Sequence, residues 1–306
     1  MGKQVFKGII PPMITPLSDT DKLDVAGLER LIEHILAGGV HGLFILGTTG
    51  EAQSLSYALR QELIERVCRQ VAGRVPVLVG ITDTSLKESL MLSEKACQCG
   101  AAAVVSAAPY YYAPAQAELI DFYMALADRL PLPMFLYNMP SHVKVMMEPD
   151  TVEAIAAHPN VIGLKDSSAN LVYFHTLIQR MKKRPDFSLL MGPEELTGEA
   201  VLLGGHGGVN GGANMFPRLY VDMYEAAASA DIPCLRKIQE RIMAISTTIY
   251  KVGRYGSSYL KGVKCTCSLL GICSDEMALP YRKFNAPERE KLRRILESLD
   301  VEVVNP

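Results

Sequence analysis

The chain has 306 residues, and 49% of them are hydrophobic, which is enough for one large domain or two ordinary ones with a sizeable core. Its 31 basic and 33 acidic residues give a net charge of -2 without a long basic run. This balance gives no electrostatic reason to expect nucleic acid or an anionic membrane surface as a partner. The N-terminal apolar stretch is too short to span a bilayer and contains three prolines. These features predict a cytoplasmic protein that binds small molecules.

Cysteine and histidine patterns give no sign of a metal site. The seven cysteines contain no CxxC pair, and an odd number of them in a long chain fits a reducing compartment. The six histidines are scattered, with no HxH or HxxxH pair. We therefore expect no metal and no bound cofactor.

Short apolar runs recur along the chain, and each is followed by a segment with helical spacing of apolar residues. The predicted strands cover residues 8–15, 42–47, 75–81, 102–108, 132–138, 161–165, 187–191 and 207–210. The predicted helices between and after them cover residues 24–38, 56–72, 85–99, 116–129, 149–157, 170–182, 196–203 and 217–228. Eight βα units in a row are the pattern of a parallel sheet with helical crossovers.

An α/β fold, a (β/α)8 TIM barrel, is the architecture that this pattern favours, because closure leaves no strand edge exposed. A doubly wound open sheet is the alternative, but it would need a glycine-rich turn after the first strand, where residues 11–20 carry prolines. Beyond residue 230 the alternation stops, and further helices are predicted at 232–250, 255–270 and 286–299. The expected organisation is a catalytic barrel over 1–230 with a C-terminal helical extension over 231–306 packed on it.

Lys165 is the first candidate for chemistry, because active sites of such barrels lie at the C-terminal ends of the strands. It follows the apolar run 161–164 and precedes small polar residues. Desolvation at a strand end disfavours the ammonium form, and a neutral amine is a nucleophile toward ketones. The alternative is a lysine paired with Asp166 or with a helix carboxylate. The local sequence leaves both interpretations open.

Other predicted strand ends carry hydroxyl groups. Residues 47–51 form a turn with two threonines whose backbone N–H groups suit a carboxylate, although ordinary βα turns look similar. Three tyrosines lie between prolines at 109–114, where an aromatic interface patch is the alternative. Tyr137 ends the fifth strand and could relay a proton or simply bond to backbone. Together with the amine of Lys165, these groups could form an imine with a 2-oxo acid.

Five motifs in this order resemble the dihydrodipicolinate synthase / N-acetylneuraminate lyase family of pyruvate-dependent aldolases. They are GTTGE at 47–51, PYY at 109–111, YNMP at 137–140, GLKDS at 163–167 and GGHGGVNGGAN at 204–214. The resemblance covers nearly the whole chain. It implies an imine of a lysine with pyruvate and a homotetramer arranged as a dimer of dimers.

The resemblance also implies roles for four residues in catalysis. Lys165 is similar to the lysine that condenses with the pyruvate carbonyl, after which the protonated imine acts as an electron sink. Tyr137 is similar to the tyrosine that moves protons to and from the carbinolamine and the aldehyde oxygen. Thr48 would link Tyr137 to Tyr111, which in this family reaches across a subunit interface.

Pyruvate itself would be held at two places. The backbone N–H and hydroxyl groups of Thr48 and Thr49 would bind its carboxylate, as the resemblance implies. Val209, beside the glycine-rich segment, matches an apolar position on the methyl side of pyruvate.

The second substrate is where the sequence departs from the synthases of the family. These enzymes carry an arginine for the carboxylate of the aldehyde two residues after the proline of the YNxP motif, and here that position is His142. A histidine is mostly neutral at pH 7 and cannot offer a bidentate fork. Glu194 and Glu195 align with the acidic pair by which sialic acid lyases hold sugar hydroxyls, and Ser167 matches a hydroxyl position there. The two glutamates could instead begin the next helix, where acidic residues complement its dipole.

The leading hypothesis is therefore a lyase that cleaves or forms a 2-oxo-3-deoxy sugar acid from pyruvate and an aldehyde through an imine of Lys165. A 4-hydroxy-tetrahydrodipicolinate synthase that condenses pyruvate with aspartate semialdehyde is the alternative, made less favourable by His142. A decarboxylating dehydratase of the same family would use the same imine. A non-catalytic barrel that binds a 2-oxo acid is a further alternative from another class.

Overall fold

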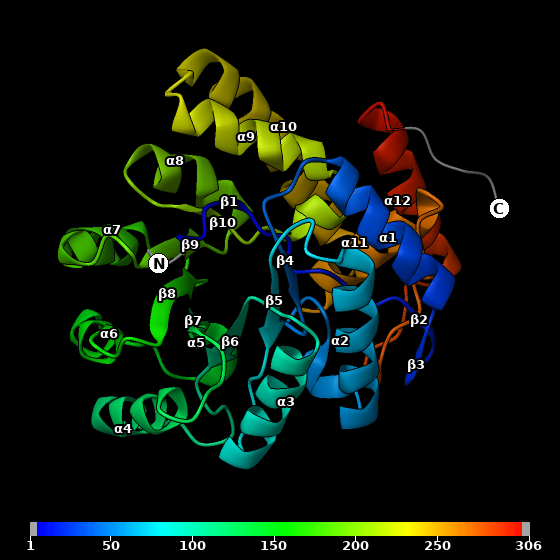
Figure 1. Ribbon diagram of the computed structural model, residues 1–306. Helices are drawn as coiled ribbons and strands as arrows, with labels where there is room; N and C mark the ends of the chain where they lie inside the picture. Colours follow the sequence, from blue (N-terminus) through cyan, green and yellow to red (C-terminus); the bar gives the residue numbers. More distant parts are fainter. Residues whose placement is uncertain (1–4, 302–306) are drawn as a thin grey trace.

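The computed structural model describes residues 5–301, and its centre is one sheet of eight parallel strands (Figure 1). The strands run in the order β1-β10-β9-β8-β7-β6-β5-β4. Their bounds are β1 Gly8–Ile9, β4 Leu43–Ile45, β5 Val77–Gly80, β6 Ala103–Ala107, β7 Met134–Asn138, β8 Val161–Asp166, β9 Ser188–Met191 and β10 Gly207–Gly208. The predicted parallel sheet of eight strands is confirmed.

The two edge strands of this sheet are joined just beyond β1. The backbone N–H of Phe44 in β4 donates to the carbonyl of Pro11 at 2.9 Å, and that of Met13 donates to the carbonyl of Phe44 at 2.8 Å. Pro12 and Phe44 form an isolated parallel bridge between these bonds. The sheet therefore curls until its edges meet, as a (β/α)8 barrel requires.

All eight strands consist entirely of buried residues, which is typical of parallel strands covered on both faces. The first strand is much shorter than the predicted segment 8–15. Pro11, Pro12 and Pro16 have no backbone N–H to donate, so regular pairing stops after Ile9.

The helices that follow the strands surround the sheet (Figure 1). They are α1 Val25–Ala37, α2 Tyr57–Val71, α3 Leu86–Gln98, α4 Gln116–Ala127, α6 Pro149–Ala156, α7 Leu171–Arg180, α8 Thr197–Leu202 and α9 Pro217–Ala228. The side chains of Asp24, Ser56 and Ser85 accept hydrogen bonds from the first turns of α1, α2 and α3. The predicted alternation of strands and helices is confirmed over all eight units.

Three further helices complete the C-terminal part: α10 Ile232–Thr248, α11 Ser258–Leu269 and α12 Ala286–Ser298. Helix α10 packs against α9, and α11 packs against α12 and against the short 3-10 helix η4, Gly211–Asn214, that follows β10. The additional helices predicted after residue 230 are thus confirmed, whereas a domain boundary at that residue stays a prediction.

Two small elements were not predicted. Leu17–Asp19 and Lys22–Leu23 form an antiparallel hairpin, β2 and β3, and Pro140–Val143 form a single helical turn, α5, directly after β7. Within residues 5–301, none of the helices is both long enough and apolar enough to cross a bilayer.

Candidate active site

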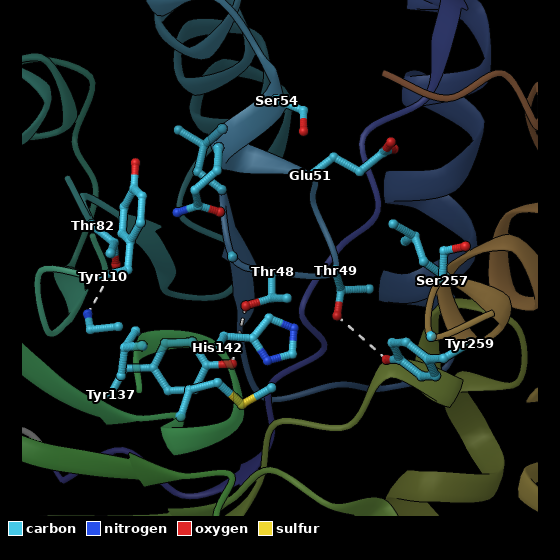
Figure 2. Close-up of a pocket in the computed structure, with 18 of the residues that line it drawn as sticks. Thr48, Thr49, Glu51, Ser54, Thr82, Tyr110, Tyr137, His142, Ser257 and Tyr259 are labelled. Atoms are coloured by element: carbon cyan, nitrogen blue, oxygen red, sulfur yellow. Dashed lines mark hydrogen bonds between the residues drawn. The ribbon is translucent and has the colours of Figure 1, made fainter. Parts of the chain in front are cut away.

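A cavity of about 640 Å³ lies at the C-terminal ends of four neighbouring strands, β4 to β7 (Figure 2). Hydroxyl-bearing and aromatic side chains dominate its wall. The residues that line it are Phe44, Leu46, Gly47, Thr48, Thr49, Glu51, Gln53, Ser54, Thr82, Ala107, Tyr110, Tyr137, Met139, His142, Val143, Tyr255, Gly256, Ser257, Tyr259, Leu260 and Tyr281. The cavity is therefore where the sequence predicted an active site.

Lys165 is buried in β8 and lies beside Tyr137 in the neighbouring strand β7. Its Nζ atom is 4.0 Å from the centre of the Tyr137 ring and 5.0 Å from that of the Phe44 ring, and both rings line the cavity. The Asp166 carboxylate does not approach this amine but accepts hydrogen bonds from Asn138 Nδ2 at 2.9 Å and from the hydroxyl of Ser168 at 2.9 Å. This geometry argues against the interpretation of Lys165 as one half of an ion pair with Asp166.

Tyr137 and Thr48 are in hydrogen-bond contact. The Tyr137 hydroxyl is 3.3 Å from Oγ1 of Thr48, which lies in the turn after β4 (Figure 2). Tyr111 is placed differently: its side chain is 73% exposed and does not line the cavity, whereas its neighbour Tyr110 does. Within one chain, the structure therefore brings together Lys165, Tyr137 and Thr48 and leaves Tyr111 on the surface.

The turn after β4 is tightly held. The Thr49 side chain is buried, and its Oγ1 lies 3.4 Å from the hydroxyl of Tyr259 on α11 (Figure 2). Glu51 takes up a left-handed backbone conformation with φ of 56°, and its N–H donates to the carbonyl of Thr48 at 3.1 Å. The hydroxyl of Thr15 donates to the carbonyl of Gly50 at 2.7 Å. Such a turn keeps backbone N–H groups in fixed directions, which suits an anion.

His142 lies in α5 at the wall of the cavity. Its Nδ1 atom is 3.0 Å from the hydroxyl of Ser141. Partial burial, and then the nearby charge of Lys165, lower the pKa of His142 below its usual value of 6.5. His142 is therefore mostly neutral at pH 7, and Lys165 lies close enough to disfavour its protonation. Lys144, two residues on, donates to the carbonyl of Tyr111 at 3.2 Å and does not line the cavity.

Glu194 is buried away from the cavity. Its Oε1 accepts hydrogen bonds of 2.6 Å from the hydroxyls of Tyr220 and Tyr250, and its Oε2 accepts one of 2.8 Å from the backbone N–H of Gly212. Burial raises the pKa of Glu194 to about 7, against the lowering effect of these bonds. Because both oxygens already have protein donors, the geometry argues against Glu194 as a group that holds sugar hydroxyls.

Three other predicted binding residues also lie outside the cavity wall. Glu195 is half-buried, and its carbonyl accepts from Nε2 of Gln239 at 2.7 Å. Ser167 is half-buried and donates its backbone N–H to Asn138 at 2.8 Å. Val209 is buried after β10, and its N–H donates to Met191 at 2.8 Å. Their roles toward a substrate stay predictions.

The sequence did not predict that the C-terminal part would line the cavity. Tyr255, Gly256, Ser257, Tyr259 and Leu260 come from the start of α11 and the turn before it. The helix predicted at 255–270 begins only at residue 258, which leaves the preceding segment free to cover the barrel. The glycines and serines at 253–258 were the one local signal of a turn there. Across the part of the chain that the structure describes, no group of three or more His, Cys, Asp or Glu side chains could hold a metal ion.

Comparison with known proteins gives consistent results over the whole length. The Dihydrodipicolinate synthetase family matches residues 5–299. A 4-hydroxy-tetrahydrodipicolinate synthase of Methanospirillum hungatei is 33% identical over 298 residues, which cover 97% of this chain and 100% of that protein. The corresponding enzyme of Methanopyrus kandleri is 34% identical over 301 residues, 98% of each chain.

Solved structures agree with this assignment. A dihydrodipicolinate synthase from Bacteroides thetaiotaomicron shares 60% identity and superimposes with a TM-score of 0.94, covering 97% of this chain and 100% of that one. A prophage protein of the dihydrodipicolinic acid synthase family from E. coli K12, in complex with pyruvate, shares 29% identity with a TM-score of 0.92, covering 98% and 100%. The chain therefore belongs to the dihydrodipicolinate synthetase family and is a lyase of the Schiff-base aldolase type.

Proposed function

We propose that the protein joins pyruvate to an aldehyde, or reverses this reaction, through an imine of Lys165. The observation that carries the proposal is the buried amine of Lys165 against the ring of Tyr137, whose hydroxyl contacts Thr48. An amine is a nucleophile toward ketones, and the tyrosine provides a group that can move protons beside it.

In this mechanism Thr48 and Thr49 bind the pyruvate carboxylate, and Lys165 Nζ attacks the carbonyl carbon. Tyr137 delivers the proton with which the carbinolamine oxygen leaves as water. The protonated imine then loses a proton from the methyl carbon to the phenolate of Tyr137, which becomes a phenol again, and the iminium accepts the electron pair to give an enamine. The enamine carbon attacks the aldehyde carbon, Tyr137 protonates the new alkoxide, and water releases the product and regenerates the amine of Lys165.

We propose aspartate semialdehyde as the aldehyde, so that the reaction is that of a 4-hydroxy-tetrahydrodipicolinate synthase. The support is the name carried by full-length relatives at 33% and 34% identity. The position of Glu194 adds to it, since the carboxylate that favoured a polyol substrate is bound to Tyr220, Tyr250 and Gly212 instead.

A 2-oxo-3-deoxy sugar acid is the second candidate. The cavity wall carries the hydroxyls of four threonine and serine side chains besides Thr48, namely Thr49, Ser54, Thr82 and Ser257, and it includes no lysine or arginine among the described residues. A neutral His142 stands where a charged group would pair with the semialdehyde carboxylate. This wall suits a neutral, hydroxyl-rich aldehyde.

We also propose that a second subunit completes the site in a homotetramer built as a dimer of dimers. Tyr111 is exposed, with its ring edge-to-face against Tyr112 at 5.3 Å between centroids. An exposed aromatic pair at the edge of an active site is the composition of an interface. In the assembly Tyr111 of one subunit would then reach Thr48 of its partner and extend the hydroxyl relay.

Borohydride trapping tests the imine directly. The protein is incubated with pyruvate and reduced, and mass spectrometry locates the adduct; we expect it on Lys165 in the wild type and in Lys95→Ala, a surface control, but not in Lys165→Ala. Absence of the adduct at saturating pyruvate would overturn the proposal. Pyruvate binding that survives Lys165→Ala, with no turnover by the wild type, would favour a non-catalytic barrel.

The aldehyde is tested by a substrate panel. Aspartate semialdehyde, N-acetylneuraminate and a series of 2-oxo-3-deoxy acids are assayed by uptake or release of pyruvate. A kcat/KM for the semialdehyde above that for every sugar acid is the expected result. The reverse order would favour the second candidate and leave the imine chemistry intact.

A further inference from the structure

A lysine and a glutamate from distant parts of the chain form an ion pair in the interior. Lys264 on α11 donates to Oε1 of Glu51, in the turn after β4, and both side chains are completely buried. Lys264 Nζ also donates to the carbonyl of Glu276 at 2.6 Å. The other oxygen of Glu51 accepts the backbone N–H of Ala278 at 2.9 Å. The two charges thus neutralise each other, and the pair also forms hydrogen bonds with the carbonyl of Glu276 and the N–H of Ala278.

Glu51 is part of the turn that carries the proposed carboxylate site. Its N–H donates to the carbonyl of Thr48 at 3.1 Å, and its φ of 56° is a left-handed conformation that a non-glycine residue adopts only when its surroundings hold it. The side chain of Glu51 is therefore an anchor that holds the turn to Lys264 and Ala278 of the C-terminal part.

Helix α11 touches the same turn a second time. Tyr259 lies five residues before Lys264, and its hydroxyl is 3.4 Å from Oγ1 of Thr49. The ring of Tyr259 packs edge-to-face on Tyr250 at 4.8 Å between centroids, so it is itself held in place. One helix of the C-terminal part therefore contacts the turn through a charge at Glu51 and a hydroxyl at Thr49.

We propose that Lys264 is a positioning residue for pyruvate: through Glu51 it holds the backbone N–H groups of the Thr48–Thr49 turn in the orientation that receives the carboxylate. The inference rests on the proposed function, in which this turn binds pyruvate. Loss of Lys264 leaves a buried carboxylate without its counter-charge, and the turn must move to let water reach it. A displacement of about 1 Å at a binding group costs up to ~100-fold in rate.

The test compares Lys264→Met, which keeps an unbranched side chain one atom shorter and without the charge, with the wild type in the borohydride assay. The half-saturating pyruvate concentration should rise about tenfold or more, since the carboxylate loses its oriented donors. Methyl pyruvate has no carboxylate, so its half-saturating concentration in the variant should stay close to that in the wild type. Lys283→Met removes an exposed ion pair with Glu276 and serves as the matched control. We expect it to leave the half-saturating concentrations of pyruvate and methyl pyruvate unchanged.

The double variant Glu51→Gln/Lys264→Met covers the case in which the single variant does not fold, because it leaves no unpaired buried charge. It should fold, and its half-saturating pyruvate concentration should still be about threefold or more above that of the wild type, since the ammonium no longer links the turn to α11. A folded single or double variant whose half-saturating pyruvate concentration equals that of the wild type would overturn the role of Lys264. An equal rise in the half-saturating concentrations of pyruvate and methyl pyruvate would overturn it too. Failure of the proposed function is distinguishable, because the wild type would then give no adduct.

Discussion

The amine of Lys165 lies 4.0 Å from the centre of the Tyr137 ring, so the face of the ring covers the buried nitrogen while the hydroxyl of the same tyrosine reaches Thr48 at 3.3 Å. Tyr137 therefore has two separable parts. The ring packs against the amine and can attract it as a cation, and the hydroxyl is the group that we propose to transfer protons. The first prediction separates these two contributions.

Tyr137→Phe keeps the ring against Lys165 and removes only the hydroxyl. We expect turnover to fall by roughly 10² to 10⁴, because proton transfer to the carbinolamine and the alkoxide loses its donor. The borohydride adduct should still reach full occupancy after long incubation, measured by mass spectrometry. Tyr112→Phe, an exposed tyrosine outside the cavity, is the control and should retain wild-type turnover. Unchanged turnover in Tyr137→Phe would contradict the assignment of the relay.

Tyr111 should act on the cavity of a neighbouring subunit. Tyr111→Phe and Lys165→Ala are each expected to lose most activity alone. Co-expressed and allowed to form mixed dimers, they should recover activity at about a quarter of the sites, since a mixed dimer contains one site with both intact residues. Steady-state assays of purified mixed protein check this. If Tyr111 has no role in catalysis, Tyr111→Phe alone stays fully active; if it acts within its own chain, mixing recovers nothing.

His142→Arg should shift the choice of aldehyde. A guanidinium can bind the carboxylate of aspartate semialdehyde in bidentate fashion, which the neutral imidazole cannot, so kcat/KM for the semialdehyde relative to glyceraldehyde should rise by roughly 30-fold. His142→Gln, a neutral variant of comparable size, should leave the ratio as in the wild type. Because burial and the charge of Lys165 lower the pKa of His142, protonation of the wild type can assist carboxylate binding only below pH 6.5. If kcat/KM for the semialdehyde relative to glyceraldehyde is equal in the arginine and glutamine variants, residue 142 does not determine the choice of aldehyde.

Glu194→Gln should change how stability depends on pH. Burial raises the pKa of Glu194 in the folded state to about 7, above its ordinary value of 4.5, so the folded protein holds this proton more tightly than the unfolded chain. The resulting stabilisation is complete below pH 4.5 and is lost as the pH rises through 7. Relative to the variant, the wild type should therefore lose stability across this window, at up to about 1.4 kcal/mol per pH unit.

Urea unfolding at a series of pH values measures this difference. The hydrogen bond from Gly212 that the glutamine weakens adds a constant offset and leaves the slope unaffected. Glu199→Gln, an exposed neighbour, should shift stability by less than about 0.5 kcal/mol at any pH. If the free energies of unfolding of the wild type and Glu194→Gln change in parallel with pH, Glu194 keeps one protonation state over this range.

Local sequence was sufficient for the alternation of strands and helices and for the position of Lys165. Apolar runs bounded by glycine and followed by helical periodicity identify buried parallel strands, and a lysine at such a strand end stands out from its surroundings. The first strand shows the limit of this reasoning. Segment 8–15 contains a single polar residue, Thr15, but prolines remove the donors that regular pairing needs, so β1 ends at Ile9.

The wall of the cavity could be predicted only in part. Thr48 and Thr49 follow a predicted strand and Tyr137 lies near the end of another, so all three could be assigned by position. Tyr255 and Tyr281 instead reach the cavity through a path of the C-terminal segment that no local pattern describes. The same holds for Glu194, whose partners Tyr220 and Tyr250 are 26 and 56 residues away. The spacing of apolar residues predicts which face of one helix or strand is buried. It does not indicate which side chains from distant parts of the chain pack against that face.

The buried pair of Lys264 and Glu51 joins residues separated by 213 positions in the chain. During synthesis the N-terminal strands emerge first, and the Glu51 carboxylate must stay hydrated until helix α11 and the segment up to Ala278 have been made. The turn after β4 can therefore take its final form only when almost the entire polypeptide has left the ribosome. A nascent chain that already contains Lys165 is, for this reason, still without the finished turn that we propose to bind pyruvate.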